Sequence, residues 1–364
     1  MGLLGDGLPV VVMLFLNAVA AVMVSLVKVA MDGGMNPLVL VTLQQLTASI
    51  FLTPIAYFKE VTMLSLLSIN LSSHYWKSRP KLTLEIFGYL FLSAALGAAL
   101  RQYMIFVGLR YTTATFVTAF SNIAPVLTFL LAVATRSEAL NLKSKTGMAK
   151  LVGTLISLGG AMVLTLYKGV ALTHAAPPHH RQHHQAAAQE GSSHAKWTLG
   201  TLAILGNCVC LSCWFLLQGR LARKYPHVYS CNSFMSGLSF LQVAAVGLCT
   251  QRTISPWIIS SKFQILTVLY AGIVGCGISF VLLTWCIEKR GPVFVAAFIP
   301  VVQIIVSVID FCILHEQLYL GSVLGSVLVI GGLYLLLWGK RQEALHCPPK
   351  EVEDDKEQQL PVQN

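Results

Sequence analysis

Charged residues are scarce in this chain of 364 residues. Lysine, arginine, aspartate and glutamate make up 11% of the sequence, whereas hydrophobic residues make up 55%. An average soluble domain is about a quarter charged, so this chain has too few polar side chains to cover a folded soluble surface. The composition excludes a soluble globular enzyme and a disordered scaffold, and it indicates that lipid surrounds most of the chain.

Acidic residues are the scarcer of the two signs, with 15 against 25 basic residues and a net charge of +10. In a soluble protein this excess would suggest a nucleic acid as partner. Here the basic residues lie at the ends of apolar segments, so we expect the lipid bilayer as partner and no nucleic acid. Most of the nine cysteines lie inside apolar segments, which argues against a secreted disulfide framework.

Complete catalytic and metal-binding motifs are missing from the sequence. His315 and Glu316 begin the pattern of a zinc protease, but Tyr319 stands where the second histidine ligand is required. No nucleotide-binding loop and no serine nucleophile motif occur. We therefore expect no enzymatic activity, no cofactor and no metal site.

Ten apolar segments are long enough to cross a bilayer, which takes about 20 residues of helix. They predict an all-α integral membrane protein with ten transmembrane helices. The segments are residues 9–31, 36–58, 85–109, 113–135, 147–167, 197–219, 230–250, 265–287, 292–313 and 320–339.

The basic residues predict the orientation of these segments, because lysine and arginine are retained in the cytoplasm during insertion. With the N-terminus inside, 17 of the 25 basic residues fall in cytoplasmic segments and 6 fall on the opposite side. Both termini are therefore expected in the cytoplasm.

An internal repeat relates the two halves of the chain. A gap-free shift of 178 residues places Phe116, Val117, Ala119 and Phe120 on Phe294, Val295, Ala297 and Phe298, and Glu138 on Glu316. Each half has five helices, and an odd number inverts the second half relative to the first. Two inverted repeats of this kind are a recurrent architecture of secondary transporters, with the solute site between the halves.

These patterns divide the chain into four parts. The first repeat covers residues 9–167 and contains an insert at 59–84, for which we expect an interfacial helix. A polar, histidine-rich linker follows at 168–196, and the second repeat covers 197–339. Residues 340–364 are expected to form a disordered cytoplasmic tail.

Polar residues inside the spans are the candidates for solute contact, because polar groups are costly in a bilayer. The amides of Asn17, Gln44, Asn122 and Gln303 are predicted near the midplane, where they can bind a carboxylate or an ammonium group. Amides can equally serve as contacts between helices.

Ionisable residues are rare within the spans. Arg101 is predicted in the outer half of the third span, as an anion contact or as a partner of Asp310. Lys28 and Asp310 are expected to form an outer polar cluster, although Lys28 can also extend to water. Pro125 and Pro300 interrupt the backbone hydrogen bonds of the fourth and ninth spans, either to shape a solute path or as plain kinks.

Three segments, Gly108–Ala132, Lys289–Phe298 and His315–Lys340, resemble the plant EamA-domain transporters. The resemblance is to the nodulin-like, walls-are-thin-related branch of the drug/metabolite transporter superfamily, also called the "usually multiple acids move in and out" family. It implies two EamA repeats that move amino acids, auxin or related carboxylate metabolites. It also implies a multi-pass protein of the plasma membrane or tonoplast, of which we favour the plasma membrane.

The sequence therefore predicts a transporter of small organic solutes that works by alternating access between two inverted repeats. The alternative is a membrane receptor or scaffold without transport, or an inactive isoform that carries the insert. Whether the chain forms a homo-oligomer is left open.

Overall fold

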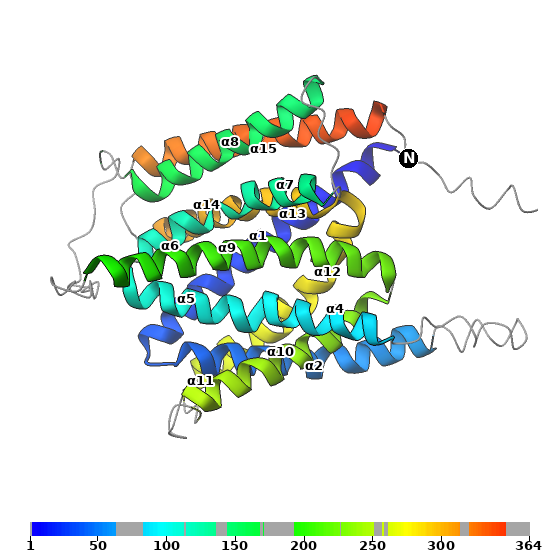
Figure 1. Cartoon of the computed structure of the whole chain (residues 1–364), viewed down its shortest axis with the longest axis vertical. Helices are drawn as coiled ribbons and strands as arrows, with labels where there is room; N and C mark the ends of the chain where they lie inside the picture. Colours follow the sequence, from blue (N-terminus) through cyan, green and yellow to red (C-terminus); the bar gives the residue numbers. More distant parts are fainter. Residues whose placement is uncertain are drawn as a thin grey trace, which may run out of the picture.

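The computed structural model describes residues 2–62, 83–112, 114–135, 144–167, 170, 193–225, 227–250, 257, 261–313 and 320–346. In this part of the chain the secondary structure is entirely helical (Figure 1). The expectation of an all-α fold is confirmed. Most of the expected insert and linker, and the end of the tail, lie outside the described residues.

The described helices fall into the two halves expected from the repeat. The first half contains α1 (Gly2–Asp32), α2 (Pro37–Ala56), η1 (Tyr57–Thr62), α4 (Leu84–Ala94), η3 (Ala95–Ala99), α5 (Leu100–Tyr111), α6 (Ala114–Ser121), α7 (Ala124–Ala134) and α8 (Lys145–Leu166). The second half contains α9 (Ser193–Lys224), α10 (Val228–Thr250), α11 (Lys262–Tyr270), η5 (Ala271–Ile278), α12 (Ser279–Arg290), α13 (Pro292–Ala297), α14 (Ile299–Ile313) and α15 (Leu320–His346).

Nine helical segments of the described chain are long and apolar enough to cross a membrane. The remaining expected span, 113–135, is divided into α6 and α7 by a turn at Asn122 and Ile123. Pro125 lies in the first turn of α7. It has no N–H to donate to the carbonyl of Ser121, so a continuous helix loses a bond at this place.

The second half has a matching interruption. The ninth expected span is divided into α13 and α14 at Phe298, and Pro300 follows in the first turn of α14. Both prolines therefore begin a new helix, where a missing N–H is tolerated. The sequence predicted that both prolines lie inside continuous helices. In the structure each of these two spans is instead a broken helix.

Segments of π-helix also occupy equivalent places in the two halves. η3 lies between α4 and α5, and η5 lies between α11 and α12. The shift of 178 residues places Gly97 of η3 on Gly275 of η5. Insertions of this kind are rare inside α-helices and are frequent at functional sites.

The two halves are inverted relative to one another. α8 and α15 are equivalent helices, and Gly153 faces Gly332 while Gly160 faces Gly325, so the two helices run antiparallel. α2 and α10 form a second equivalent pair. The hydroxyls of Thr53 and Ser233 lie 2.8 Å apart in that pair, and one turn away Ser49 lies beside Gly237.

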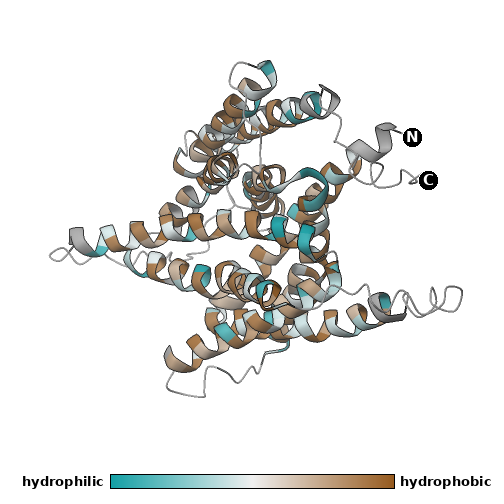
Figure 2. Cartoon of the chain, turned by 45° about the vertical axis from the view of Figure 1, so that its right-hand side comes forward, coloured by the Kyte–Doolittle hydropathy of each residue, from teal (hydrophilic) through white to brown (hydrophobic). Residues whose placement is uncertain are grey.

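Apolar side chains cover the outside of the molecule as well as its core. Hydrophobic residues follow the long helices over most of their length (Figure 2). Leu202, Val327 and Ile330 have 59%, 63% and 57% of their surface exposed, which suits contact with lipid chains. The buried core joins both halves, since Ile86 and Leu90 of α4 belong to the same cluster as Phe294 and Phe298.

Candidate functional site

A cavity of about 380 Å³ lies between the two halves. Its walls come from α1, α9, η5, α12, α13 and α14 and from the turn after α6, so it opens beside both broken helices. Its apolar lining consists of Met13, Leu16, Val19, Ala20, Met23, Phe215, Phe280, Leu283, Val295, Ile299 and Val302. Its other lining residues are Asn17, Ser121, Asn122, Gly275, Ser279 and Gln303.

Three of the amides predicted from the sequence meet in this cavity. Nδ2 of Asn122, in the turn between α6 and α7, donates to Oε1 of Gln303 in α14 over 3.2 Å. This bond crosses from one half to the other, and both of its residues line the cavity. Asn17 lies on α1, where its Nδ2 donates to the carbonyl of Met13 over 2.8 Å.

Two hydroxyls complete the polar part of the lining. Ser121 donates to the carbonyl of Val117 over 2.8 Å, and Ser279 donates to the carbonyl of Val274 over 2.7 Å. Because each proton is directed into its own helix, the two hydroxyls offer lone pairs to the cavity. None of the described lining residues is ionisable. The arrangement therefore suits a solute with a sizeable apolar body and a few hydrogen-bonding groups.

Gln44 and Arg101 lie outside this lining, in a second polar cluster. Nε2 of Gln44 donates to Sγ of Cys276 over 3.4 Å. Nε of Arg101 donates to the carbonyl of Gly97 over 3.0 Å. Cys276 directly follows the lining residue Gly275 in η5, but it is not itself part of the lining.

The two prolines border a small void of about 10 Å³ between α7, α8, α13, α14 and α15. Asn122 lines both this void and the central cavity. Oγ of Ser157 also lines the void; it is buried and has no hydrogen-bond partner among the described residues. A void of this size and polarity has room for about one water molecule. Pro125 and Pro300 thus lie behind the cavity wall rather than on its surface.

The expected outer cluster is described only in part. Lys28 is exposed on α1, and Asp310 belongs to α14, but the side chain of Asp310 lies outside the described residues. The pairing of these two residues stays a prediction. Within the described chain, no three histidine, cysteine or acidic side chains lie close enough to hold a metal ion.

Ser121, Ser279 and Gly275 also line the cavity but were not predicted from the sequence as site residues. The shift of 178 residues places Arg101 on Ser279 and Gly97 on Gly275. The repeat could therefore have pointed to both residues as site candidates. For Ser121 the signal was weaker, since a serine next to an asparagine in an apolar run carries no specific pattern.

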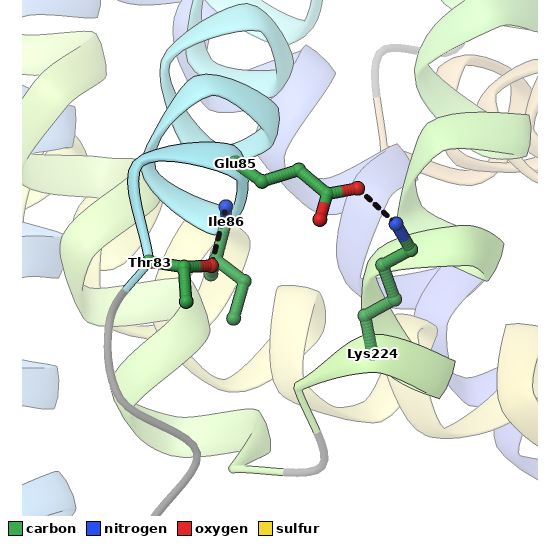
Figure 3. Close-up of polar contacts among 4 residues, drawn as sticks. All are labelled: Thr83, Glu85, Ile86 and Lys224. Atoms are coloured by element: carbon green, nitrogen blue, oxygen red, sulfur yellow. Dashed lines mark hydrogen bonds and ion pairs between the residues drawn. The ribbon is translucent and has the colours of Figure 1, made fainter.

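One ion pair joins the halves at an end of the bundle (Figure 3). Nζ of Lys224, the last residue of α9, pairs with Oε1 of Glu85 in the first turn of α4. The same ammonium group lies 4.9 Å from the ring centre of Tyr89. Thr83 caps α4, because its Oγ1 accepts from the backbone N–H of Ile86 over 3.4 Å. The capped turn holds Glu85 toward α9.

Comparison with known families agrees with this geometry. The profile of the EamA-like transporter family matches residues 8–166 and 198–338. This chain belongs to the EamA-like transporter family. It is therefore a multi-pass membrane transporter, and the resemblance inferred from its sequence is confirmed.

Relatives among plant proteins are similar over nearly the whole chain. A WAT1-related protein of Arabidopsis thaliana is 40% identical over 334 residues, which are 92% of this chain and 87% of the relative. Another is 38% identical over 360 residues, or 98% of this chain and 94% of the relative. A crystal structure of a protein 17% identical superposes with a TM-score of 0.62, over 93% of this chain and 99% of the other, which supports the fold alone.

Proposed function

We propose that this transporter moves small organic solutes that carry a carboxylate on an apolar body, such as amino acids, auxin or related metabolites. The observation that carries the proposal is the central cavity, which is mostly apolar and presents amide groups from both halves. The family resemblance suggests that the solute carries a carboxylate. The amide N–H groups are the donors to which this carboxylate would bind. The process needs no chemical step, and we propose that the chain has no enzymatic activity.

Alternating access between the inverted repeats is the proposed mechanism. Asn122 and Gln303 lie close to the interruptions of the two broken helices, one in each half, and their hydrogen bond joins the halves across the cavity. If the halves rock against one another, this bond and the solute contacts change together. A receptor or scaffold without transport would have no need for polar groups from both halves at one cavity.

The proposed location is the plasma membrane, with both termini in the cytoplasm. The distribution of basic residues in the sequence supports this orientation. A further agreement is that Lys59, Arg220 and Lys224 all lie in segments assigned to the same side.

Counterflow in proteoliposomes tests the proposal. Vesicles that contain the purified chain would be loaded with unlabelled amino acids or indole-3-acetate. Uptake of the labelled solute into these vesicles would then be measured. We expect uptake of a carboxylate solute by the unmodified chain. Loss of one hydrogen bond to a charged solute group costs about 1.5–3 kcal/mol, so Gln303→Leu should lower the apparent affinity by about one to two orders of magnitude.

Matched variants separate binding from folding. Gln242→Leu is the same substitution outside the cavity, where the Gln242 amide donates to the carbonyl of Phe91 in α4, and it should retain counterflow. Arg101→Ala asks whether the second polar cluster takes part in binding. Absence of flux with every solute, from protein that remains folded, would move the function to the receptor alternative.

A further inference from the structure

A second hollow lies on the outside of the molecule, away from the central cavity. This groove has a volume of about 560 Å³, and its lining residues all come from α2, η1 and α10. α2 and α10 cross here through small residues, since a Cβ on Gly237 would lie 3.2 Å from Oγ of Ser49. The hydroxyls of Thr53 and Ser233 bond to one another across the crossing. Small side chains on the floor leave the groove hollow between larger ones at its edges.

The edges of the groove are apolar and exposed. Tyr57 and Leu241 each have 61% of their surface exposed, and Phe234 has 49%. On α10 the lining extends from Ser230 to Leu241. At 1.5 Å per residue this is about 16 Å along the helix, or about half of a 30 Å hydrocarbon core. The groove therefore has the length of one leaflet.

A positive charge lies at one end of the groove. Nζ of Lys59 donates to the hydroxyl of Tyr229 over 3.4 Å and lies 5.2 Å from the centre of the same ring. Tyr229 directly precedes the lining residue Ser230, so the ammonium group is held at the mouth. Three residues separate the end of α9 from the start of α10, and α9 brings Arg220 and Arg223 to the same end of the bundle.

We propose that this groove binds an anionic phospholipid of the leaflet that contacts Lys59. One acyl chain would lie in the groove along Phe234 and Leu241, and the headgroup phosphate would meet the ammonium group. Basic residues beside an apolar surface are the usual means of attracting anionic lipid. A second copy of the chain is a poorer occupant, because the groove is concave and its mouth is cationic. By the orientation expected from the sequence, the leaflet is the cytoplasmic one.

The test measures binding alone, so its result does not depend on whether the chain transports a solute. The full chain would be reconstituted in phosphatidylcholine vesicles that contain a phosphatidylserine with a photoactivatable group on its acyl chain. A second preparation would contain a phosphatidylcholine with the same group. After illumination, labelled peptides are mapped by mass spectrometry. We expect the serine lipid to label residues 230–241 of α10 more strongly than the choline lipid does.

Two substitutions sharpen the expected result. Lys59→Gln should lower labelling by the serine lipid about fivefold, the factor expected for one basic residue at an anionic surface. Lys262→Gln removes an exposed lysine at the start of α11 and should leave this labelling unchanged. Ser230→Phe should fill the mouth and reduce labelling by both lipids, without loss of folded protein.

Three results would overturn the proposal. Equal labelling by both lipids would show that the groove does not select an anionic headgroup. Labelling spread evenly over α8, α10 and α15 would show that the lipid is not bound in the groove. In a parallel experiment with a bifunctional crosslinker, crosslinks between the α10 helices of two chains would show that a second copy occupies this face.

Discussion

At the scale of single residues, Gly97 of η3 and Gly275 of η5 occupy equivalent places but have different neighbours. A Cβ on Gly97 would lie 2.6 Å from Nε1 of Trp214, within the interface of η3 with α9. A Cβ on Gly275 would lie 2.5 Å from Sδ of Met23, which lines the central cavity. The indole ring of Trp214 is rigid and buried, whereas a methionine side chain adapts readily.

These neighbours predict opposite effects for one substitution. Gly97→Ala should destabilise the fold by about 1–3 kcal/mol, because Trp214 cannot move aside without strain. Gly275→Ala should leave stability nearly unchanged but displace Met23 into the cavity, and so weaken solute binding severalfold. Thermal unfolding in detergent together with counterflow distinguishes the two outcomes. Equal loss of stability in both variants would contradict this assignment.

At the scale of elements, the pairing of α8 with α15 depends on close backbone contact. A Cβ on Gly332 would lie 2.4 Å from the backbone nitrogen of Ser157 and 2.6 Å from the carbonyl oxygen of Gly153. Gly331 is its neighbour on α15, yet a Cβ there would meet nothing within 4 Å. Small residues allow helices to approach closely in lipid, where van der Waals packing is a main source of association.

Adjacent glycines therefore provide a matched test of this helix pair. Gly332→Ala should force α8 and α15 apart and cost about 1–3 kcal/mol of stability, since backbone atoms cannot yield locally. Gly331→Ala should be neutral or slightly stabilising, because alanine is favoured over glycine in a helix. The midpoint of thermal unfolding measures both. A similar loss from Gly331→Ala would show that helix flexibility, and not packing, is what these glycines provide.

Much of this architecture could be predicted from the sequence, because apolar length reports spans and a constant offset reports a repeat. The interruptions at Asn122 and Phe298 could not be placed, since both lie in apolar runs and Pro125 and Pro300 signal them only two or three residues late. It was harder still to predict which side of each span faces the central cavity. Arg101 was predicted to contact the solute but does not line the central cavity, and which side of a span faces a cavity depends on how its neighbours pack.

At the scale of the whole molecule, contacts between the halves follow the repeat. α4 packs on α9 and α10, and in the same way its repeat equivalent, α11, packs on α1 and α2. The ion pair of Glu85 with Lys224 lies at one end of this arrangement, between a helix of each half. Under the proposed alternating access, a contact that joins the halves at one end stabilises the state closed at that end, and it must separate when that end opens.

Neutralising this pair is predicted to change the rate of exchange rather than solute affinity. Glu85→Gln and Lys224→Gln should each alter counterflow rates a few-fold, because an exposed pair is weak and is screened by salt. Lys289→Gln, an exposed lysine near the end of α12, is the matched control and should have no effect. The exchanged pair, Glu85→Lys with Lys224→Glu, should restore most of the original rate at low ionic strength. If the exchanged pair is no better than the single variants, the attraction between these two charges does not hold this end closed.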